Sequence, residues 1–153
     1  MIAITWQKFT TATAAHYELL LDADPNRALV TNYVKNGTCF EARYQDELVG
    51  VLVVIATRPA TAEIVNVAVK ETFQGQGVGE QMVRKALAWC QTQLYQTVEI
   101  GTGSSSFQAL YLYQKCGFRM THIDRDFFVR HYAEEIIENK IVLRDMVRLS
   151  QDL

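Results

Sequence analysis

Residues 62–100 constrain the fold more than any other segment, because an apolar strand, a glycine-rich loop, an amphipathic helix and a second strand follow one another there. The strands are AEIVNVAV (62–69) and TVEIG (97–101). Across residues 78–94, apolar side chains recur at helical spacing, with charged and amide side chains on the opposite face. Two strands joined by a helix in this way are expected to run parallel, in a right-handed crossover.

The segments on either side of this unit predict antiparallel strands. TCFEARY (38–44) and LVGVLVVI (48–55) have the pattern of a hairpin, and the second strand is apolar on both faces and therefore central. FRMTHI (118–123) and IVLRDMVRL (141–149) are predicted to be the last two strands. The chain is therefore expected to form an α/β fold with a mixed, largely antiparallel central sheet.

Three further helices are expected around the sheet. Two short ones precede the hairpin, and Asp24 is expected to cap the second, with Pro25 at its first position. The third follows the crossover unit, where Ser105 and Gln108 have the spacing of a capping box. That helix is predicted to run through ALYLYQKC (109–116).

Composition narrows the class of protein. The 153 residues, of which 49% are hydrophobic, suit a single domain over residues 1–153. A net charge of −2 provides no strong field for a nucleic acid, and the longest apolar run, LVGVLVVIA, is less than half of the roughly 20 residues of a membrane helix. The cysteines and histidines lack metal-ligand spacing. We expect a cytoplasmic protein with no metal, no nucleic-acid partner and no membrane association.

Three glycines, Gly75, Gly77 and Gly79, alternate in the segment KETFQGQGVGEQM, between the strand 62–69 and the helix 78–94. Glycine lets the main chain approach a ligand closely, and amide groups at a helix N-terminus attract phosphate. A flexible turn is the simpler interpretation, but a turn alone needs fewer glycines. The segment is therefore predicted to bind a phosphate or diphosphate.

Two other phosphate-binding motifs fit this segment less well. A P-loop has a lysine after its last glycine, whereas Glu80 and Gln81 follow Gly79. A dinucleotide fingerprint that starts at Gly75 requires a third glycine where Glu80 stands. Glu99 stands about where that fingerprint has its ribose-binding acid. The antiparallel hairpin upstream, however, does not suit the dinucleotide-binding fold. An oxidoreductase that uses a nicotinamide dinucleotide is the weaker alternative.

Two motifs occur in the order, and on the predicted elements, that are typical of one known family. Gln74, Gly77 and Gly79 follow the pattern (Gln/Arg)-x-x-Gly-x-(Gly/Ala), and ALYLYQKCGF (109–118) is similar to A-x-x-L-Y-x-K-x-G-F. With both motifs, the chain resembles the GNAT superfamily of N-acetyltransferases. The resemblance implies a GNAT-like sheet with a parallel, splayed strand pair and helices on both faces. It also implies acetyl-CoA (coenzyme A) as co-substrate, lying between the splayed strands.

The same resemblance implies how acetyl-CoA is held. Main-chain amides of the glycine-rich loop are expected to bind its diphosphate. These amides belong to Gln74, Gly75, Gln76, Gly77, Val78 and Gly79. The main chain of Val67, Ala68 and Val69 is expected to pair with the pantetheine arm like an added strand, and an amide there to polarise the thioester carbonyl.

Two catalytic residues are also implied by the resemblance. Glu63 stands where some members of the family have a glutamate base, although a solvated residue at the strand edge is an equally good interpretation. Tyr113 is expected to protonate the leaving thiolate, with Tyr111 as its rival, since both hydroxyls cannot face one site on a helix. Asn66 is a candidate for orienting water or substrate. Cys116 is expected to be a buried thiol rather than a nucleophile.

The predicted function is transfer of an acetyl group from acetyl-CoA to a primary amine, by direct attack of the amine on the thioester. The acceptor is expected to be a small molecule or a peptide amine, and fold analogy does not choose between them. The alternative is a non-catalytic module that senses acyl-CoA. The last strands permit a homodimer.

The segment 123–139 is the part of the chain that the family motifs leave unexplained. Its acidic and aromatic side chains either attract a cationic amine and pack its carbon chain, or form a solvated loop with apolar anchors. The interleaved Arg125, Arg130 and His131 dilute the negative charge and favour the solvated loop.

Overall fold

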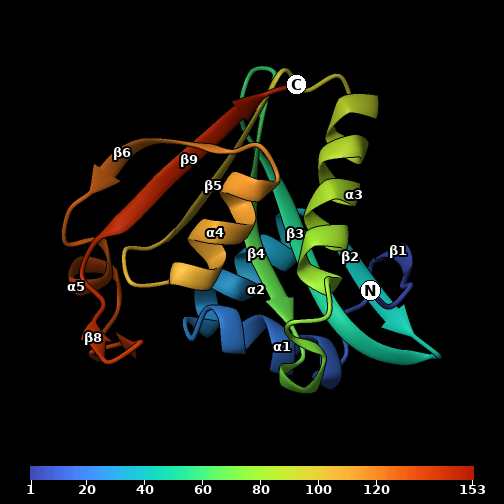
Figure 1. Cartoon of the computed structure of the whole chain (residues 1–153), viewed down its shortest axis with the longest axis horizontal. Helices are drawn as coiled ribbons and strands as arrows, with labels where there is room; N and C mark the ends of the chain where they lie inside the picture. The colour runs from blue at the N-terminus through green and yellow to red at the C-terminus, as the bar shows by residue number, and fades with distance from the viewer.

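The computed structural model describes residues 1–153, which form a seven-stranded sheet, a small two-stranded sheet and helices on both faces of the larger one (Figure 1). The helices are α1 (Ala14–Ala23), α2 (Arg27–Asn36), α3 (Val78–Thr92), α4 (Phe107–Lys115) and α5 (Phe127–His131). The strands are β1 (Thr5–Phe9), β2 (Thr38–Tyr44), β3 (Glu47–Arg58), β4 (Thr61–Val69), β5 (Thr97–Gly103), β6 (Arg119–Asp124), β7 (Ile137–Glu138), β8 (Ile141–Val142) and β9 (Met146–Asp152). None of these helices is both long enough and apolar enough to cross a membrane.

The large sheet has the strand order β1-β2-β3-β4-β5-β9-β6, and β4 and β5 are its one parallel pair. This arrangement confirms the mixed, largely antiparallel sheet and the parallel crossover predicted for residues 62–100. The crossover helix α3 lies with α4 on one face of the sheet, and α1 and α2 cover the other face (Figure 1).

The two parallel strands separate after a short ladder. They are paired from Thr61 with Thr97 to Ile64 with Ile100. Beyond that point β4 stays with β3 along its whole remaining length, whereas β5 stays with β9 as far as Gly103. A wedge therefore opens between β4 and β5, as expected for the splayed pair.

A β-bulge lies in β4 just past this point. Val54 of β3 pairs with Ile64, but the preceding Val53 pairs with Asn66, so Val65 is an extra residue on β4. An extra residue reverses the alternation of side chains between the two faces of a sheet. Ile64 consequently packs in the core under α3, whereas Asn66 points to the opposite face and bonds the end of α1.

A hydrophobic core on each face holds the helices against the sheet. On one side, the predicted apolar stripe of α3 is buried, including Met82, Val83 and Ala86. On the other side, Leu20 of α1 and Val30 of α2 pack on β3 and β4. The wedge is thus bounded by helices whose positions are set by buried apolar surface, the dominant stabilising contribution in folding.

Some of the expected helix caps and element ends are wrong. Asn26 caps α2, and Asp24 is instead the C-terminal cap of α1. The capping box of Ser105 and Gln108 does not form, because α4 begins after Ser106. The last predicted strand is also interrupted, since β8 and β9 are separate strands in different sheets.

Candidate active site

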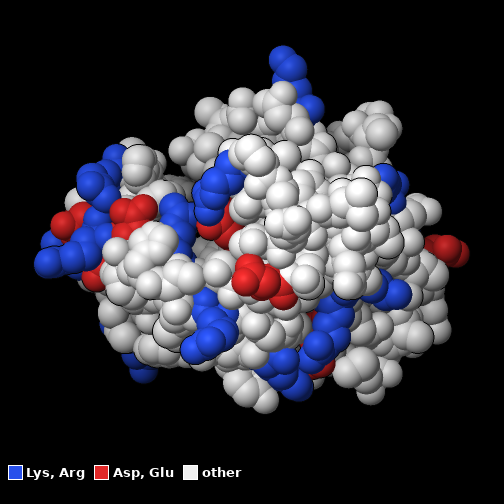
Figure 2. All heavy atoms as spheres, turned by 90° about the horizontal axis from the view of Figure 1, so that it is seen from above, with Lys and Arg blue, Asp and Glu red and all other residues white.

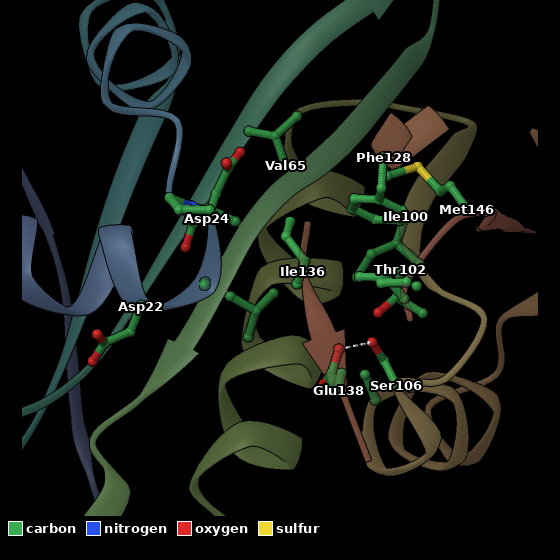
Figure 3. Close-up of a pocket in the computed structure, with 18 of the residues that line it drawn as sticks. Asp22, Asp24, Val65, Ile100, Thr102, Ser106, Phe128, Ile136, Glu138 and Met146 are labelled. Carbon is green, nitrogen blue, oxygen red and sulfur yellow. Dashed lines mark hydrogen bonds between the residues drawn. The ribbon is translucent and has the colours of Figure 1, made fainter. Parts of the chain in front are cut away.

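A cavity of about 490 Å³ lies where β4 and β5 separate (Figure 3). Both strands line it just past their last residue pair, with residues 64–67 of β4 and 100–103 of β5. The remaining wall comes from the end of α1, from α4, from α5 and the chain that leads into β7, and from Leu143 and Met146. Binding sites for small molecules usually have volumes of roughly 300–1,000 Å³, so the cavity has the size of such a site.

The glycine-rich loop presents a run of free amides at the N-terminus of α3. Gly75 and Gly77 have φ angles of 77° and 81°, which glycine adopts without strain. None of the amides from Gly75 to Glu80 has a main-chain acceptor, whereas the Gln74 amide donates to the carbonyl oxygen of Glu71 (3.2 Å). The free set therefore lies one residue later than the set predicted from the sequence. Free amides at the positive end of a helix dipole form an anion-binding site.

Two other residues of the same motif position this loop. Gln74 donates from Nε2 to the carbonyl oxygen of Val69 (3.0 Å), which ties the loop to the last residue of β4. A Cβ atom at Gly79 would lie 3.2 Å from the side chain of Leu112, so glycine allows α3 to approach α4 closely. The motif therefore serves the packing of α3 and α4 as well as the loop.

One edge of β4 is free beside the cavity. Val67, Ala68 and Val69 pair with β3, but no strand pairs with their other edge, because the ladder with β5 ends at Ile64. An extended ligand can add to such an edge through main-chain hydrogen bonds. Only residues 70–74 separate this edge from the free amides, so one elongated molecule can contact both.

The two tyrosines of α4 have different surroundings. Tyr113 is 7% exposed, lines the cavity and packs edge-on against Phe118. Burial raises the pKa of the Tyr113 phenol, so its hydroxyl keeps its proton at neutral pH. Tyr111 is 65% exposed and lies beside Lys115, with 5.8 Å between Nζ and the ring centroid. Of the two, only Tyr113 reaches the cavity.

Glu63 lies on β4 two residues before Val65, which lines the cavity, but Glu63 itself is not part of the wall. One of its carboxylate oxygens is 3.6 Å from the guanidinium group of Arg148. Burial raises the pKa of Glu63 and outweighs the opposing charge of Arg148. A carboxylate with a raised pKa can accept a proton, but its access to a ligand in the cavity is indirect.

Asn66 is a buried polar residue in the wall of the cavity, 5% exposed. Its Nδ2 donates to the carbonyl oxygen of Leu20 at the end of α1 (3.1 Å), but its Oδ1 has no partner in the chain. A buried acceptor without a partner costs free energy unless water or a ligand supplies a hydrogen. Asn66 therefore holds an unsatisfied acceptor in the wall of the cavity, with almost no surface of that oxygen exposed.

The sequence patterns did not reveal the acidic residues of the cavity. Asp22 and Asp24, from the end of α1, and Glu138, from β7, all line it (Figure 3). The Ser106 hydroxyl donates to Glu138 (2.6 Å), which fastens the β7–β8 hairpin to the start of α4. No motif marks these acids, because they come from distant parts of the chain and meet only in the folded protein.

The acids of segment 123–139 do not line the cavity, except for Glu138. Asp124 and Asp126 form ion pairs with arginines. Figure 2 shows acidic and basic side chains intermixed at the left of the view, where β6 and α5 lie. The aromatic part of the segment does reach the cavity, through Phe128 and Tyr132. In this segment, the cavity is thus lined by aromatic side chains and by Glu138, and not by the acids before Glu138.

Cys116 is buried at the end of α4 and does not line the cavity. Burial raises the pKa of its thiol, so the reactive thiolate is disfavoured. The structure contains no group of three or more His, Cys, Asp or Glu side chains that could hold a metal ion.

Comparison with known proteins identifies the class to which this fold and site belong. The sequence model of the Acetyltransferase (GNAT) family matches residues 4–118, which is most of the chain. The chain therefore belongs to the GNAT family of acetyltransferases, in agreement with the motifs around Gly77 and Tyr113. Acetyl-CoA is the co-substrate of the reaction that this family catalyses.

Individual relatives cover nearly the whole chain. The uncharacterized N-acetyltransferase YvbK of Bacillus subtilis (strain 168) is 54% identical over 137 residues, which are 90% of this chain and 88% of the relative. The crystal structure of a Bacillus subtilis acetyltransferase in complex with CoA superposes with a TM-score of 0.96 and 49% identity over 99% of both chains. A GNAT family acetyltransferase from Elizabethkingia anophelis with acetyl-CoA bound has a TM-score of 0.94 and 41% identity over 98% of both chains. These superpositions confirm the predicted GNAT fold.

Proposed function

We propose that this chain transfers the acetyl group of acetyl-CoA to a primary amine, by direct attack of the amine nitrogen on the thioester carbonyl. The observation that carries the proposal is the cavity at the separation of β4 and β5, which the free edge of β4 and the buried Tyr113 both line. The same cavity continues to α1 and α5, so it has room for a second molecule beside the thioester.

The proposed binding of acetyl-CoA uses the free main-chain groups. The amides from Gly75 to Glu80 hold the diphosphate, and the edge of β4 from Val67 to Val69 pairs with the pantetheine arm. This arrangement brings the thioester to the separation of the strands. An amide of the β4 edge then stabilises the negative charge that develops on the carbonyl oxygen. The CoA and acetyl-CoA complexes of the related structures support this assignment.

The transfer needs a base and an acid. An alkylammonium group has a pKa of ~10.4 and must lose a proton before its nitrogen can attack. Glu63 takes this proton through an intervening water, and its raised pKa makes it a stronger base than an exposed glutamate. As the carbon–nitrogen bond forms and the carbon–sulfur bond breaks, Tyr113 donates its proton to the departing thiolate. The nitrogen loses its second proton after the carbon–nitrogen bond has formed. This proton replaces the one that Tyr113 gave to sulfur, and Glu63 releases the first proton to solvent.

A screen of primary amines, with release of free thiol as the readout, tests the proposal. Thiol should appear only when acetyl-CoA and an accepted amine are both present, and the amine should gain one acetyl group by mass spectrometry. Binding of acetyl-CoA without transfer to any amine would contradict the transfer and favour a sensor of acyl-CoA. Failure of the folded protein to bind acetyl-CoA in calorimetry would contradict the assigned binding residues.

A further inference from the structure

The cavity carries negative charge that nothing in the chain neutralises. Asp22, Asp24 and Glu138 line it, and no lysine, arginine or histidine does. None of the three carboxylates takes part in an ion pair anywhere in the structure. Figure 3 shows Asp22 and Asp24 on one side of the cavity, and Glu138 with Ser106 on the other. A positively charged ligand would find complementary charge here, and an anion would find none.

The position of two of these acids is unfavourable for the helix that bears them. Asp22 lies in the last turn of α1 and Asp24 is its C-terminal cap, and this last turn contains no basic residue. The C-terminus of a helix is the negative end of its dipole, where Lys or Arg is stabilising and Asp is not. Helix stability therefore does not account for two aspartates at this place.

Asn66 adds an independent sign of a ligand at the same place. Its unpartnered Oδ1 is buried in the wall of the cavity. Its Nδ2 and the Asp24 amide both donate to the carbonyl oxygen of Leu20, at 3.1 and 3.0 Å, so the two residues meet at the end of α1. Oδ1 of Asn66 has almost no accessible surface of its own, so an N–H donor bound at Asp24 would satisfy it as well once the amide turns towards the cavity.

The Asp24 carboxylate is fixed through one of its two oxygens. The Tyr132 hydroxyl and the Asn26 amide both donate to its Oδ1, at 2.9 and 3.0 Å, and this leaves Oδ2 without a partner. Phe128 and Ile136 line the cavity and offer apolar surface to a carbon chain. The carboxylate is thus held in place by the protein, with one oxygen available.

We propose that the acceptor is a small di- or polyamine, and that its second, non-reacting ammonium group binds to the free Oδ2 of Asp24, beside Asn66. This inference rests on the proposed function and names its acceptor class. The reacting amine must be neutral when it attacks, so a carboxylate without a basic partner is suited to a different nitrogen that keeps its charge. A charge-assisted hydrogen bond from that ammonium is among the stronger polar contacts in proteins. An amino acid is disfavoured, because no cation in the cavity can bind its carboxylate.

Three probes with the same number of carbons test the proposal. They are putrescine, with an amine at each end of a butane chain, butylamine, with one amine, and γ-aminobutyrate, with an amine and a carboxylate. Binding to the CoA complex is measured by calorimetry, and transfer from acetyl-CoA by thiol release. Putrescine should have an affinity and a kcat/KM about tenfold or more above those of butylamine, and γ-aminobutyrate should be the poorest of the three. Equal values for putrescine and butylamine would overturn the proposal.

Substitutions locate the second ammonium group. Asp24→Asn should lower the putrescine affinity and kcat/KM about tenfold more than those of butylamine, so that the preference disappears. Asn66→Ala should reduce the preference in the same direction. Asp46→Asn is the matched control, because Asp46 lies in the turn between β2 and β3 and does not line the cavity. A preference for putrescine that survives in Asp24→Asn would overturn the assigned position.

The two proposals can fail separately in this experiment. If putrescine binds in an Asp24-dependent way but no thiol is released with any amine, the recognition of a diamine stands and acetyl transfer fails. If butylamine and putrescine are acetylated equally well, acetyl transfer stands and the diamine preference fails.

Discussion

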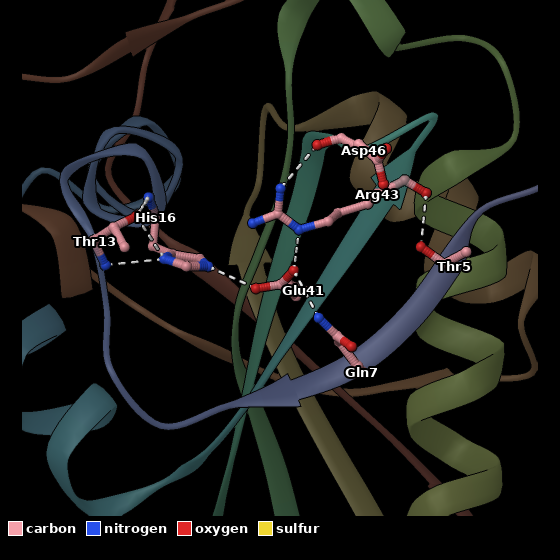
Figure 4. Close-up of polar contacts among 7 residues, drawn as sticks. All are labelled: Thr5, Gln7, Thr13, His16, Glu41, Arg43 and Asp46. Carbon is pink, nitrogen blue, oxygen red and sulfur yellow. Dashed lines mark hydrogen bonds and ion pairs between the residues drawn. The ribbon is translucent and has the colours of Figure 1, made fainter.

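The polar network around His16 and the polar wall of the cavity around Asn66 are both buried, but they differ in how their hydrogen bonds are satisfied. His16 and Glu41 are 3% and 4% exposed, and every polar atom of their side chains has a partner (Figure 4). In the cavity, Oδ1 of Asn66 has no partner and Asp24 has no cation. A buried polar group that is satisfied within the chain supports the fold. One left unsatisfied in the wall of a cavity does not support the fold in this way.

His16 completes its network as both acceptor and donor. The Thr13 amide donates to its Nδ1 (2.9 Å), so the ring carries its proton on Nε2, which donates to Glu41 (3.0 Å). Gln7 and Arg43 donate to the other carboxylate oxygen. Burial alone would raise the pKa of Glu41, but the hydrogen bonds from Arg43, His16 and Gln7 outweigh it and lower that pKa. The network thereby joins α1 to the edge of the sheet.

The largest effect is expected in the cavity, from the loss of one hydroxyl group. Tyr113→Phe should lower kcat by about 10²–10⁴-fold, because general acid catalysis is worth that much. The ring still packs against Phe118, so the acetyl-CoA affinity and the unfolding midpoint should be almost unchanged. Initial rates of thiol release measure kcat, and calorimetry measures the acetyl-CoA affinity and the unfolding midpoint. Tyr111→Phe is the control and should change none of these quantities. A normal kcat in Tyr113→Phe would remove Tyr113 from the mechanism.

Breaking the satisfied network around His16 should cause a large loss of stability. It should not change the rate of acetyl transfer to a comparable degree. Glu41→Ala leaves the buried His16 and the neighbouring Arg43 without their acceptor, and should lower the free energy of unfolding by about 3 kcal/mol. Urea unfolding measures this change. Glu47→Ala, which removes an exposed partner of Lys70, should cost less than about 1 kcal/mol. Equal losses in the two variants would show that the network does not stabilise the fold.

The unpaired acids of the cavity should behave in the opposite way when they are replaced. Asp22→Lys puts a cation at the negative end of the α1 dipole, and should raise the free energy of unfolding by about 0.5 kcal/mol. It should also weaken binding of putrescine by charge repulsion. Glu18→Lys makes the same charge change on the exposed side of α1, away from its end. It should neither stabilise the protein nor weaken the binding of putrescine. A destabilised Asp22→Lys protein would indicate a structural role for this aspartate.

The smallest effect is a pH dependence of opposite sign for Glu41 and Glu63. The lowered pKa of Glu41 means that its contribution to stability is present above the ordinary value of 4.5 and is lost as the pH falls through the folded value. The raised pKa of Glu63 means that its contribution is present below 4.5 and is lost as the pH rises through the folded value. In urea unfolding, Glu41→Gln should therefore be most destabilising at neutral pH. Glu63→Gln should change the free energy of unfolding more favourably at neutral pH than in acid. The same pH dependence of stability in both variants would contradict this assignment.

The crossover of residues 62–100 and the loop around Gly77 were predictable because their signals are local. The alternation of a strand and the spacing of an amphipathic helix depend only on neighbours along the chain. The φ of 81° at Gly77 is likewise a property of one residue and its helix. The caps were not predictable, since Asp24, Asn26 and the serines before α4 all have side chains that can cap a helix. Tertiary contacts chose among them, including the bond from Tyr132 to Asp24.

By itself, the sequence determined the mixed sheet, the glycine-rich loop before the crossover helix and the family, because periodicity and motif spacing are encoded along the chain. The tertiary structure decided which side chains meet in the cavity. The bulge at Val65 turns Asn66 towards α1, and the rotation of α4 brings Tyr113 rather than Tyr111 inward. Asp24 and Glu138 come together only when distant segments pack, and such contacts depend on strand register and helix docking that no local pattern specifies.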